Sequence, residues 1–142
     1  MKNKKRIILG MLVLMWMILI FSFSHQTGEE SKNSSNILVK QILNIPFFNN
    51  EELISFIIRK GAHFTIYFIG GILIYLYFNT YKIPKKNIII STIIVGILFA
   101  ISDELHQYFI SERSAELRDV AIDSAGIVLG ALVLSLIKRK SK

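Results

Sequence analysis

A chain of 142 residues has room for one domain. Its hydrophobic content of 52% and mean hydropathy of +0.49 are too apolar for a soluble domain of this size, and the apolar residues occur in blocks. The absence of cysteine excludes disulfides and thiolate metal sites. The net charge of +7 does not indicate nucleic-acid binding, because the basic residues lie at the ends of apolar runs and form no continuous face.

Four apolar runs cover residues 7–23, 62–78, 88–102 and 120–137. Each is slightly shorter than the roughly 20 residues that a helix needs to cross a bilayer. We therefore expect the helices to extend into their polar flanks, with spans at 7–24, 60–79, 87–105 and 119–138 of a single domain, 1–142. The first run begins like a signal peptide, but it is too long for a signal core and lacks a small-x-small cleavage site, which predicts an uncleaved anchor.

The charged residues predict the orientation of the four spans. If both termini are cytoplasmic, most of the seventeen basic residues lie inside, before residue 7, between 80 and 86, and after 137. All ten acidic residues then lie on the outer side. The predicted fold is thus an all-α integral membrane protein, a bundle of four transmembrane helices with cytoplasmic N- and C-termini, located as a multi-pass protein in the plasma membrane.

The long outer loop, 25–59, carries signals for further helix. Residues 34–36 (Ser-Ser-Asn) are candidate caps for a short helix that ends at Pro46, and Asn50 is a second candidate cap, with two acids in the turn after it. One interpretation is an amphipathic segment in the membrane interface, continuous with the second span. An ordinary covered loop is the alternative, and the sequence does not decide between them.

Helical spacing places the polar residues of three spans in stripes, because residues three or four apart share a helix face. Each stripe is polar at its outer end and contains small residues, which let helices pack closely in lipid, further into the membrane. The predicted packing residues are Gly70, Gly96, Ala100, Gly126 and Gly130. Ionisable side chains in lipid are expected to face the bundle interior and find one another. The predicted polar site comprises Arg59, His63, Tyr67, Asp103, Glu104, Gln107, Arg113, Asp119 and Asp123.

A plainer structural role competes with a functional one at each position. Asp119 fits a helix cap that pairs with Arg113 or Arg118, whereas Asp123 lies one turn deeper and capping does not explain it. Adjacent residues on a helix point about 100° apart, so we expect only one of Asp103 and Glu104 to face the centre, and Asp103 shares its stripe with Gln107. His63 fits either a satisfied core histidine or a site residue.

The sequence gives no positive sign of enzyme chemistry or of a cofactor. It contains no Gly-x-Ser-x-Gly and no glycine-rich phosphate loop. His63, Asp103, Asp119 and Asp123 have metal-binding chemistry, but no compact ligand spacing supports a site, so we expect neither a metal nor another cofactor. Enzymatic activity stays open, with the missing motifs against it.

Several motifs together carry a family resemblance. They are Arg59-Lys60-x-x-His63-Phe64-x-x-Tyr67, Ser102-Asp103-Glu104-x-x-Gln107, Arg113, and Asp119-x-x-x-Asp123-x-x-Gly126-x-x-x-Gly130. In this order they resemble the VanZ-like membrane proteins, as does the Phe23-Ser24-His25-Gln26 end of the first span. The sequence departs from the family before Arg113, where Ser111-Glu112 replaces a frequent Pro-Gly turn and leaves the placement of Arg113 open.

The resemblance implies a bacterial membrane protein, related to one that lowers susceptibility to the glycopeptide antibiotic teicoplanin. Three hypotheses follow. The preferred one is an outer polar site that engages a lipid-linked cell-wall precursor, another lipid-linked envelope component or the antibiotic itself. The second is a membrane-embedded acid/base enzyme acting on a lipid-linked substrate. The third is a purely structural polar stripe. The expected partners are membrane lipids and such a ligand, and no nucleic acid.

Overall fold

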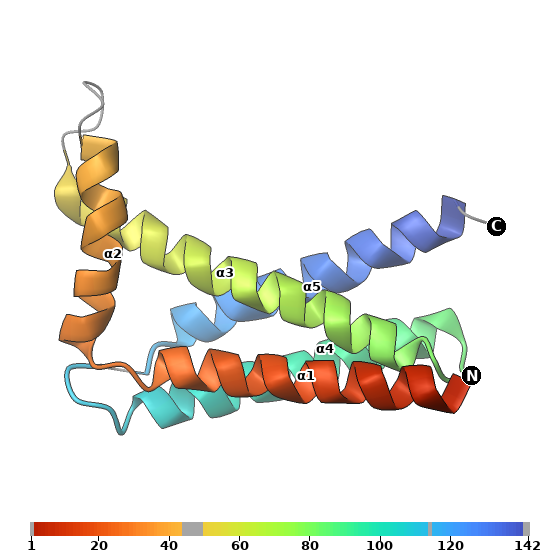
Figure 1. Ribbon diagram of the computed structural model, residues 1–142. Coiled ribbons are helices and arrows are strands. Elements are labelled where there is room, and N and C mark those ends of the chain that lie inside the picture. Colours follow the sequence, from red (N-terminus) through yellow and green to blue (C-terminus); the bar gives the residue numbers. More distant parts are fainter. Residues whose placement is uncertain (1, 44–49, 114, 141–142) are drawn as a thin grey trace.

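The computed structural model describes residues 2–43, 50–113 and 115–140, and within these ranges every regular element is a helix (Figure 1). The helices are α1 (Lys2–Ser24), α2 (Gly28–Leu43), α3 (Glu51–Phe78), α4 (Lys85–Gln107) and α5 (Leu117–Lys140). Four of them, α1, α3, α4 and α5, are long and apolar enough to cross a membrane. The predicted all-α fold with four spanning helices is therefore confirmed.

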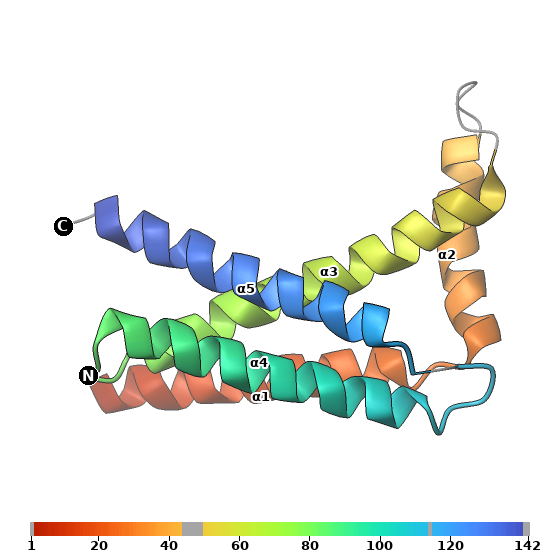
Figure 2. The same cartoon turned by 180° about the vertical axis from the view of Figure 1, so that it is seen from behind.

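The chain ends and the short helix α2 occupy opposite ends of the bundle. Both termini lie at one end in Figures 1 and 2, as an even number of crossings requires. Helix α2 lies across the other end, beside the beginning of α3. The side of the membrane that each end faces stays a prediction from the distribution of basic residues.

Helix α3 begins well before residue 60, where the second span was predicted to start. The side-chain oxygen of Asn50 accepts a hydrogen bond from the Leu53 backbone N–H at 3.0 Å, which confirms Asn50 as the cap. The 28 residues of α3 give it a length of about 42 Å, more than a bilayer core needs. The end of the predicted outer loop is thus continuous with the second span.

Helix α2 was placed incorrectly by the sequence analysis. It begins at Gly28, and residues 34–36, the predicted caps, lie inside it. The cap is Thr27: its hydroxyl accepts from the Glu30 N–H at 3.2 Å, and the Glu30 carboxylate accepts from the Thr27 N–H at 2.8 Å. This reciprocal pair is a capping box, and its Thr-x-x-Glu spacing is visible in the sequence. Residues 44–49, including the predicted terminator Pro46, lie outside the described residues.

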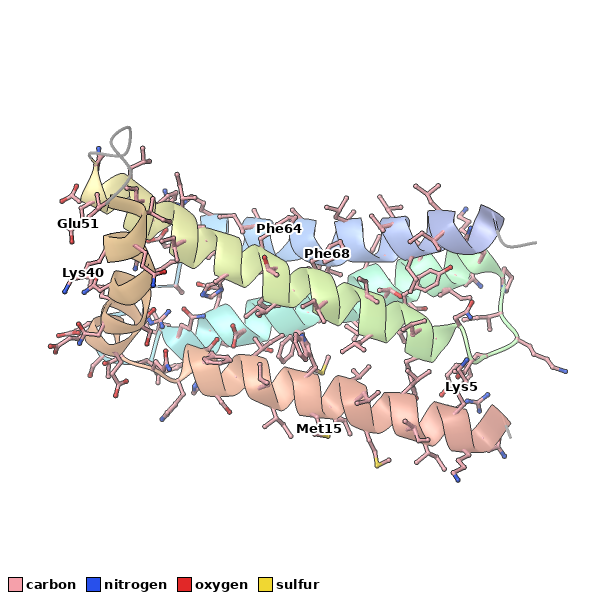
Figure 3. The ribbon with its side chains drawn as sticks, turned by 45° about the horizontal axis from the view of Figure 1, so that its top comes forward. Lys5, Met15, Lys40, Glu51, Phe64 and Phe68 are labelled. Atoms are coloured by element: carbon pink, nitrogen blue, oxygen red, sulfur yellow. The ribbon has the colours of Figure 1, made fainter. Side chains whose placement is uncertain are left out.

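Two glycines of α5 bring its backbone against that of α3. A Cβ atom added to Gly126 would lie 2.5 Å from the Phe64 carbonyl oxygen, and one added to Gly130 would overlap the Phe68 carbonyl oxygen. Figure 3 shows both phenylalanines where α3 passes α5. These two positions bring the helix backbones together as predicted, because any larger residue would push the helices apart.

The other predicted packing positions differ in how closely they approach neighbouring residues. Ala100 is completely buried, and a Cβ at Gly96 would lie 2.5 Å from the Ile127 side chain. At Gly70 the nearest atoms are at least 3.6 Å away, an ordinary van der Waals distance. The close approach on α3 is instead made by the next residue, Gly71, whose Cβ would lie 2.5 Å from the Ile127 carbonyl oxygen. Gly70 is also buried, beside Trp16 and Ile127, so α3 presents two adjacent glycines to its neighbours.

Gly130→Ala is expected to destabilise the protein by about 1–3 kcal/mol, because the methyl group has no space beside the α3 backbone. Gly70→Ala is the matched control, since its methyl group fits, and should change stability by much less. Thermal unfolding in detergent measures both. Equal melting temperatures for the two variants would contradict the packing described here.

The orientation is testable by labelling, because the natural chain has no cysteine. We expect a membrane-impermeant maleimide to label Ser111→Cys, in an exposed turn at the α2 end, in intact cells. Lys82→Cys, in an exposed position at the opposite end, should be labelled only after lysis. The reverse result would invert the predicted topology.

Candidate functional site

The polar stripes of α3, α4 and α5 meet near the α2 end of the bundle. Asp103, Asp123 and Tyr67 have no exposed surface, and Glu104 and Gln107 are 3% and 2% exposed. Burial of this many polar groups in a helical bundle requires internal partners, because lipid offers none. The partners come from α1, α3, α4 and α5, from the segment between α1 and α2, and from the loop between α4 and α5, as the contacts below show.

Asp103 is the most extensively hydrogen-bonded carboxylate of the group. One of its oxygens, Oδ2, accepts from the Ser24 hydroxyl at 2.7 Å, from the Tyr67 hydroxyl at 3.0 Å and from the Gln107 side-chain amide at 3.3 Å. These donors belong to α1, α3 and α4, so one carboxylate connects three helices. Neutral hydroxyl and amide donors thus offset part of the cost of burying this charge, whereas Oδ1 is buried without a hydrogen-bond partner among the described residues.

Glu104 is buried beside Asp103, which corrects the expectation that only one of the pair faces inward. Its Oε2 accepts from the Glu116 backbone N–H at 3.0 Å, just before α5 begins. The prediction failed because it treated the bundle as having one centre. Helix α4 is covered on two sides, by α1 and α3 near Asp103 and by the start of α5 near Glu104.

Asp123 faces His63, and the two residues join α5 to α3. His63 Nδ1 lies 3.5 Å from Asp123 Oδ1, near enough for charge attraction but long for a hydrogen bond. Among the described residues, neither Asp123 oxygen has a hydrogen-bond partner. The His63 side chain is 22% exposed, so the imidazole lies between a completely buried carboxylate and a more open space.

Asp119 pairs with Lys60 and with neither predicted arginine. Lys60 Nζ lies 2.5 and 2.6 Å from the two Asp119 oxygens. Arg118 binds Glu116 at 2.6 Å in an exposed position. Asp119 therefore joins the outer ends of α3 and α5. The sequence analysis omitted Lys60 from the site, although it lies between Arg59 and His63 in the motif.

Arg113 is held by uncharged oxygen atoms. Its Nη1 donates to Gln107 Oε1 at 3.1 Å, and its Nε donates to the Gln26 carbonyl at 3.2 Å. Glu112, before it, has φ of 61°, the left-handed conformation that favours glycine. The turn thus forms without the Pro-Gly pair that related sequences often use. Burial lowers the pKa of Arg113, and the positive charge of Arg59 lowers it further.

A cavity of about 280 Å³ adjoins this cluster and is enclosed by α1, α2, α3 and the α4–α5 loop. Arg59 and His63 line it from α3, and Arg113 lines it from the loop. Its remaining lining residues are Phe23, Ser24, Gln26, Ser31, Ser34, Ser35, Ile58, Ala62 and Ile66. No group of three His, Asp or Glu side chains in the described ranges is arranged to hold a metal ion.

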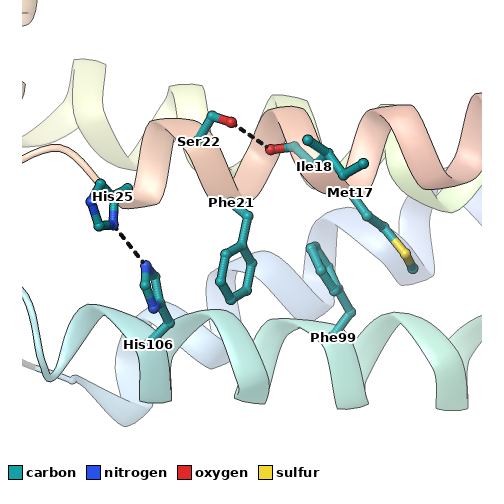
Figure 4. Close-up of a pocket in the computed structure, with 7 residues that line it drawn as sticks. All are labelled: Met17, Ile18, Phe21, Ser22, His25, Phe99 and His106. Carbon is teal, nitrogen blue, oxygen red and sulfur yellow. Dashed lines mark hydrogen bonds between the residues drawn. The ribbon is translucent and has the colours of Figure 1, made fainter.

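A second hollow of about 630 Å³ lies between α1 and α4 (Figure 4). Its apolar walls include Met17, Phe21 and Phe99. At its end, His25 Nδ1 and His106 Nε2 are 3.3 Å apart, so one imidazole donates to the other. The two histidines thus lie together at this interhelical surface.

A protein-family model described as VanZ/LLP1 matches residues 9–138, nearly the whole chain. The chain belongs to this family. No curated protein and no solved structure gave a match. The matched range contains three of the four candidate spans completely and the first from residue 9 onward, so membership of the VanZ/LLP1 family and the membrane-spanning fold support each other.

The VanZ/LLP1 chain uses site residues that periodicity alone did not identify. Ser24 donates to Asp103, and the Gln26 carbonyl binds Arg113. Both belong to the Phe23-Ser24-His25-Gln26 segment, which carried part of the family resemblance. A small polar residue at the end of an apolar run was the available signal. It was weak because such residues also end ordinary spans.

Asp103→Ala is expected to destabilise this VanZ/LLP1 protein by about 1–3 kcal/mol, because it leaves the buried hydroxyls of Ser24 and Tyr67 without their acceptor. Ser102→Ala, at the exposed neighbouring position, is the control. Thermal unfolding in detergent provides the comparison. If Asp103→Ala has the same melting temperature as Ser102→Ala, the carboxylate does not hold the helices together.

Proposed function

We propose that this VanZ-like membrane protein lies in the plasma membrane and uses its polar site, at the predicted outer face, to engage a ligand that is itself anchored in the membrane. The candidate ligands are a lipid-linked envelope component and an acylated glycopeptide such as teicoplanin. In this proposal, binding changes the susceptibility of a bacterial cell to such antibiotics.

The cavity beside the polar cluster is the observation that carries this proposal. It combines Arg59, His63 and Arg113 with apolar side chains such as Ile58 and Ile66. Pockets that hold small molecules are typically apolar with a few convergent polar groups, which is the composition found here. A purely structural role for the stripes explains the Asp103 and Asp119 contacts, but it gives no reason for an open space lined by cations.

A second candidate function is acid/base catalysis on a lipid-linked substrate. It is favoured by one observation: His63 lines the cavity, while its Nδ1 lies 3.5 Å from the buried Asp123. A carboxylate next to an imidazole can orient the ring and stabilise its protonated form. A general base becomes protonated when it takes a proton from the substrate, so such a carboxylate would assist this step. Turnover of an envelope lipid by purified protein, lost in His63→Gln, would favour this function over binding alone.

The binding proposal predicts that Asp123→Ala abolishes any glycopeptide resistance that the wild-type chain confers, while the amount of protein in the membrane stays the same. The reason is that His63 loses the carboxylate that lies 3.5 Å from its Nδ1, beside the cavity. Minimum inhibitory concentrations of teicoplanin and immunoblots of membrane fractions measure the two effects.

Arg118→Ala is the control for that experiment, because Arg118 is exposed and pairs with Glu116 away from the cavity. Asp123→Asn separates a structural role from a functional one, since it keeps the shape of the side chain and removes its charge. Unchanged resistance in Asp123→Ala and Asp123→Asn at normal abundance would refute the proposed function.

A further inference from the structure

The walls of the cavity are positively charged, although the surrounding cluster is rich in acids. Arg59, His63 and Arg113 line it, and the described lining residues include no carboxylate. The acids of the cluster do not line the cavity, and two of them have donors elsewhere. Asp103 accepts from neutral donors, and Asp119 pairs with Lys60. The charge that the cavity presents to a ligand is therefore the opposite of the charge of the cluster that supports it.

Neither cavity arginine has a carboxylate partner. Arg113 donates to two uncharged oxygens, and Arg59 makes no hydrogen bond or ion pair within the described part of the chain. The Nε of Arg59 is buried without a partner. By contrast, Lys60 and Arg118, at the same end of the bundle, are each paired with an acid. Both arginines are partly buried. Partial burial of a guanidinium without a counter-ion is unfavourable, so an anion in the cavity would offset that cost.

Two guanidinium groups near one cavity suit an oxyanion with several acceptor oxygens. Arg59 and Arg113 line the same cavity, Arg59 from α3 and Arg113 from the α4–α5 loop. The serines add few donors, because Ser24, Ser34 and Ser35 already donate to other groups. Recognition would therefore depend on the arginines, whose planar donors bind phosphate and carboxylate groups strongly.

The apolar wall indicates how such a ligand enters. Phe23 and Ile66 line the cavity from α1 and α3, the two helices whose outer ends meet there. The volume of about 280 Å³ is small for a whole lipid and is sufficient for a head group with the first carbons of its chain. A polar head at the membrane interface with a chain toward the hydrocarbon core matches this arrangement.

We propose that the cavity binds the phosphate group of an anionic membrane lipid between Arg59 and Arg113, with its hydrocarbon chain directed along Phe23 and Ile66. This inference rests on the proposed ligand-binding function of the same site and names the chemistry of the ligand. Two sources supply this chemistry: the phosphate of a bulk phospholipid and the phosphate of a polyprenyl carrier lipid.

The test uses the full chain in nanodiscs of phosphatidylcholine, with native mass spectrometry to count retained lipid. The added probes are phosphatidylglycerol, a polyprenyl phosphate and oleate, whose head group is a carboxylate. We expect retention of one or both phosphate lipids and little retention of oleate. Retention of both assigns the site to lipid phosphate in general, and retention of the polyprenyl phosphate alone assigns it to the carrier lipid.

Arg59→Gln combined with Arg113→Gln is expected to reduce retention of the phosphate lipid about tenfold or more, because two charge-assisted contacts are lost. Arg118→Gln removes a cation outside the cavity and should leave retention unchanged. Ser31→Asp keeps both arginines and adds an internal anion at a lining position, so it should also reduce retention even if the double variant folds poorly.

Retention of oleate equal to that of the phosphate lipids, or retention that neither Ser31→Asp nor the double arginine variant reduces, would overturn this inference. The proposed function would survive that result if Asp123→Ala still abolished glycopeptide resistance. If Asp123→Ala also left glycopeptide resistance unchanged, the proposed function would be refuted as well.

Discussion

The backbone contact between α5 and α3 at Gly126 and Gly130 is the constraint on which the polar site depends. Asp123 lies three residues before Gly126, on the same face of α5, so the contact that brings the helices together also turns Asp123 toward His63. Without that contact, a completely buried carboxylate would face lipid or a gap between helices, where nothing offsets its charge. The burial of Asp123 therefore depends on the close helix packing at the two glycines.

The four carboxylates of the cluster are stabilised in different ways, and this diversity separates supporting residues from candidate ligand-binding residues. Asp103 uses neutral donors, Asp119 uses Lys60, Glu104 uses a backbone N–H, and Asp123 uses His63 alone. In each of the first three arrangements at least one carboxylate oxygen has a hydrogen-bond donor, although Asp103 Oδ1 and Glu104 Oε1 have none among the described residues. Asp123 is the exception, because its single partner also lines the cavity and so links the bundle interior to a ligand.

Helix α2 supplies one wall of the cavity that contains the two arginines. Four spanning helices alone would leave the arginines of α3 and of the α4–α5 loop at an open membrane interface. With α2 across that end, its serines form one wall, and Arg59 and Arg113 face an enclosed space. The low dielectric of such a space strengthens attraction between a guanidinium and an anion, which water would weaken at an exposed surface.

The sequence by itself determined the four spanning helices, the cap at Asn50 and the helix faces on which the polar residues lie. These follow from run length, hydropathy and the spacing of three and four residues, which are local properties of each helix. The same local reasoning misplaced the start of α2, because the Thr27-x-x-Glu30 box was overlooked.

Only the tertiary structure decided which side chains contact one another. It paired Asp119 with Lys60, buried Glu104 as well as Asp103, placed Gly71 against the Ile127 backbone, and left Arg59 facing a cavity. Periodicity gives the face of a helix on which a residue lies, whereas its partner depends on the rotation and depth of the neighbouring helices. Those are set by backbone contacts between segments far apart in the chain.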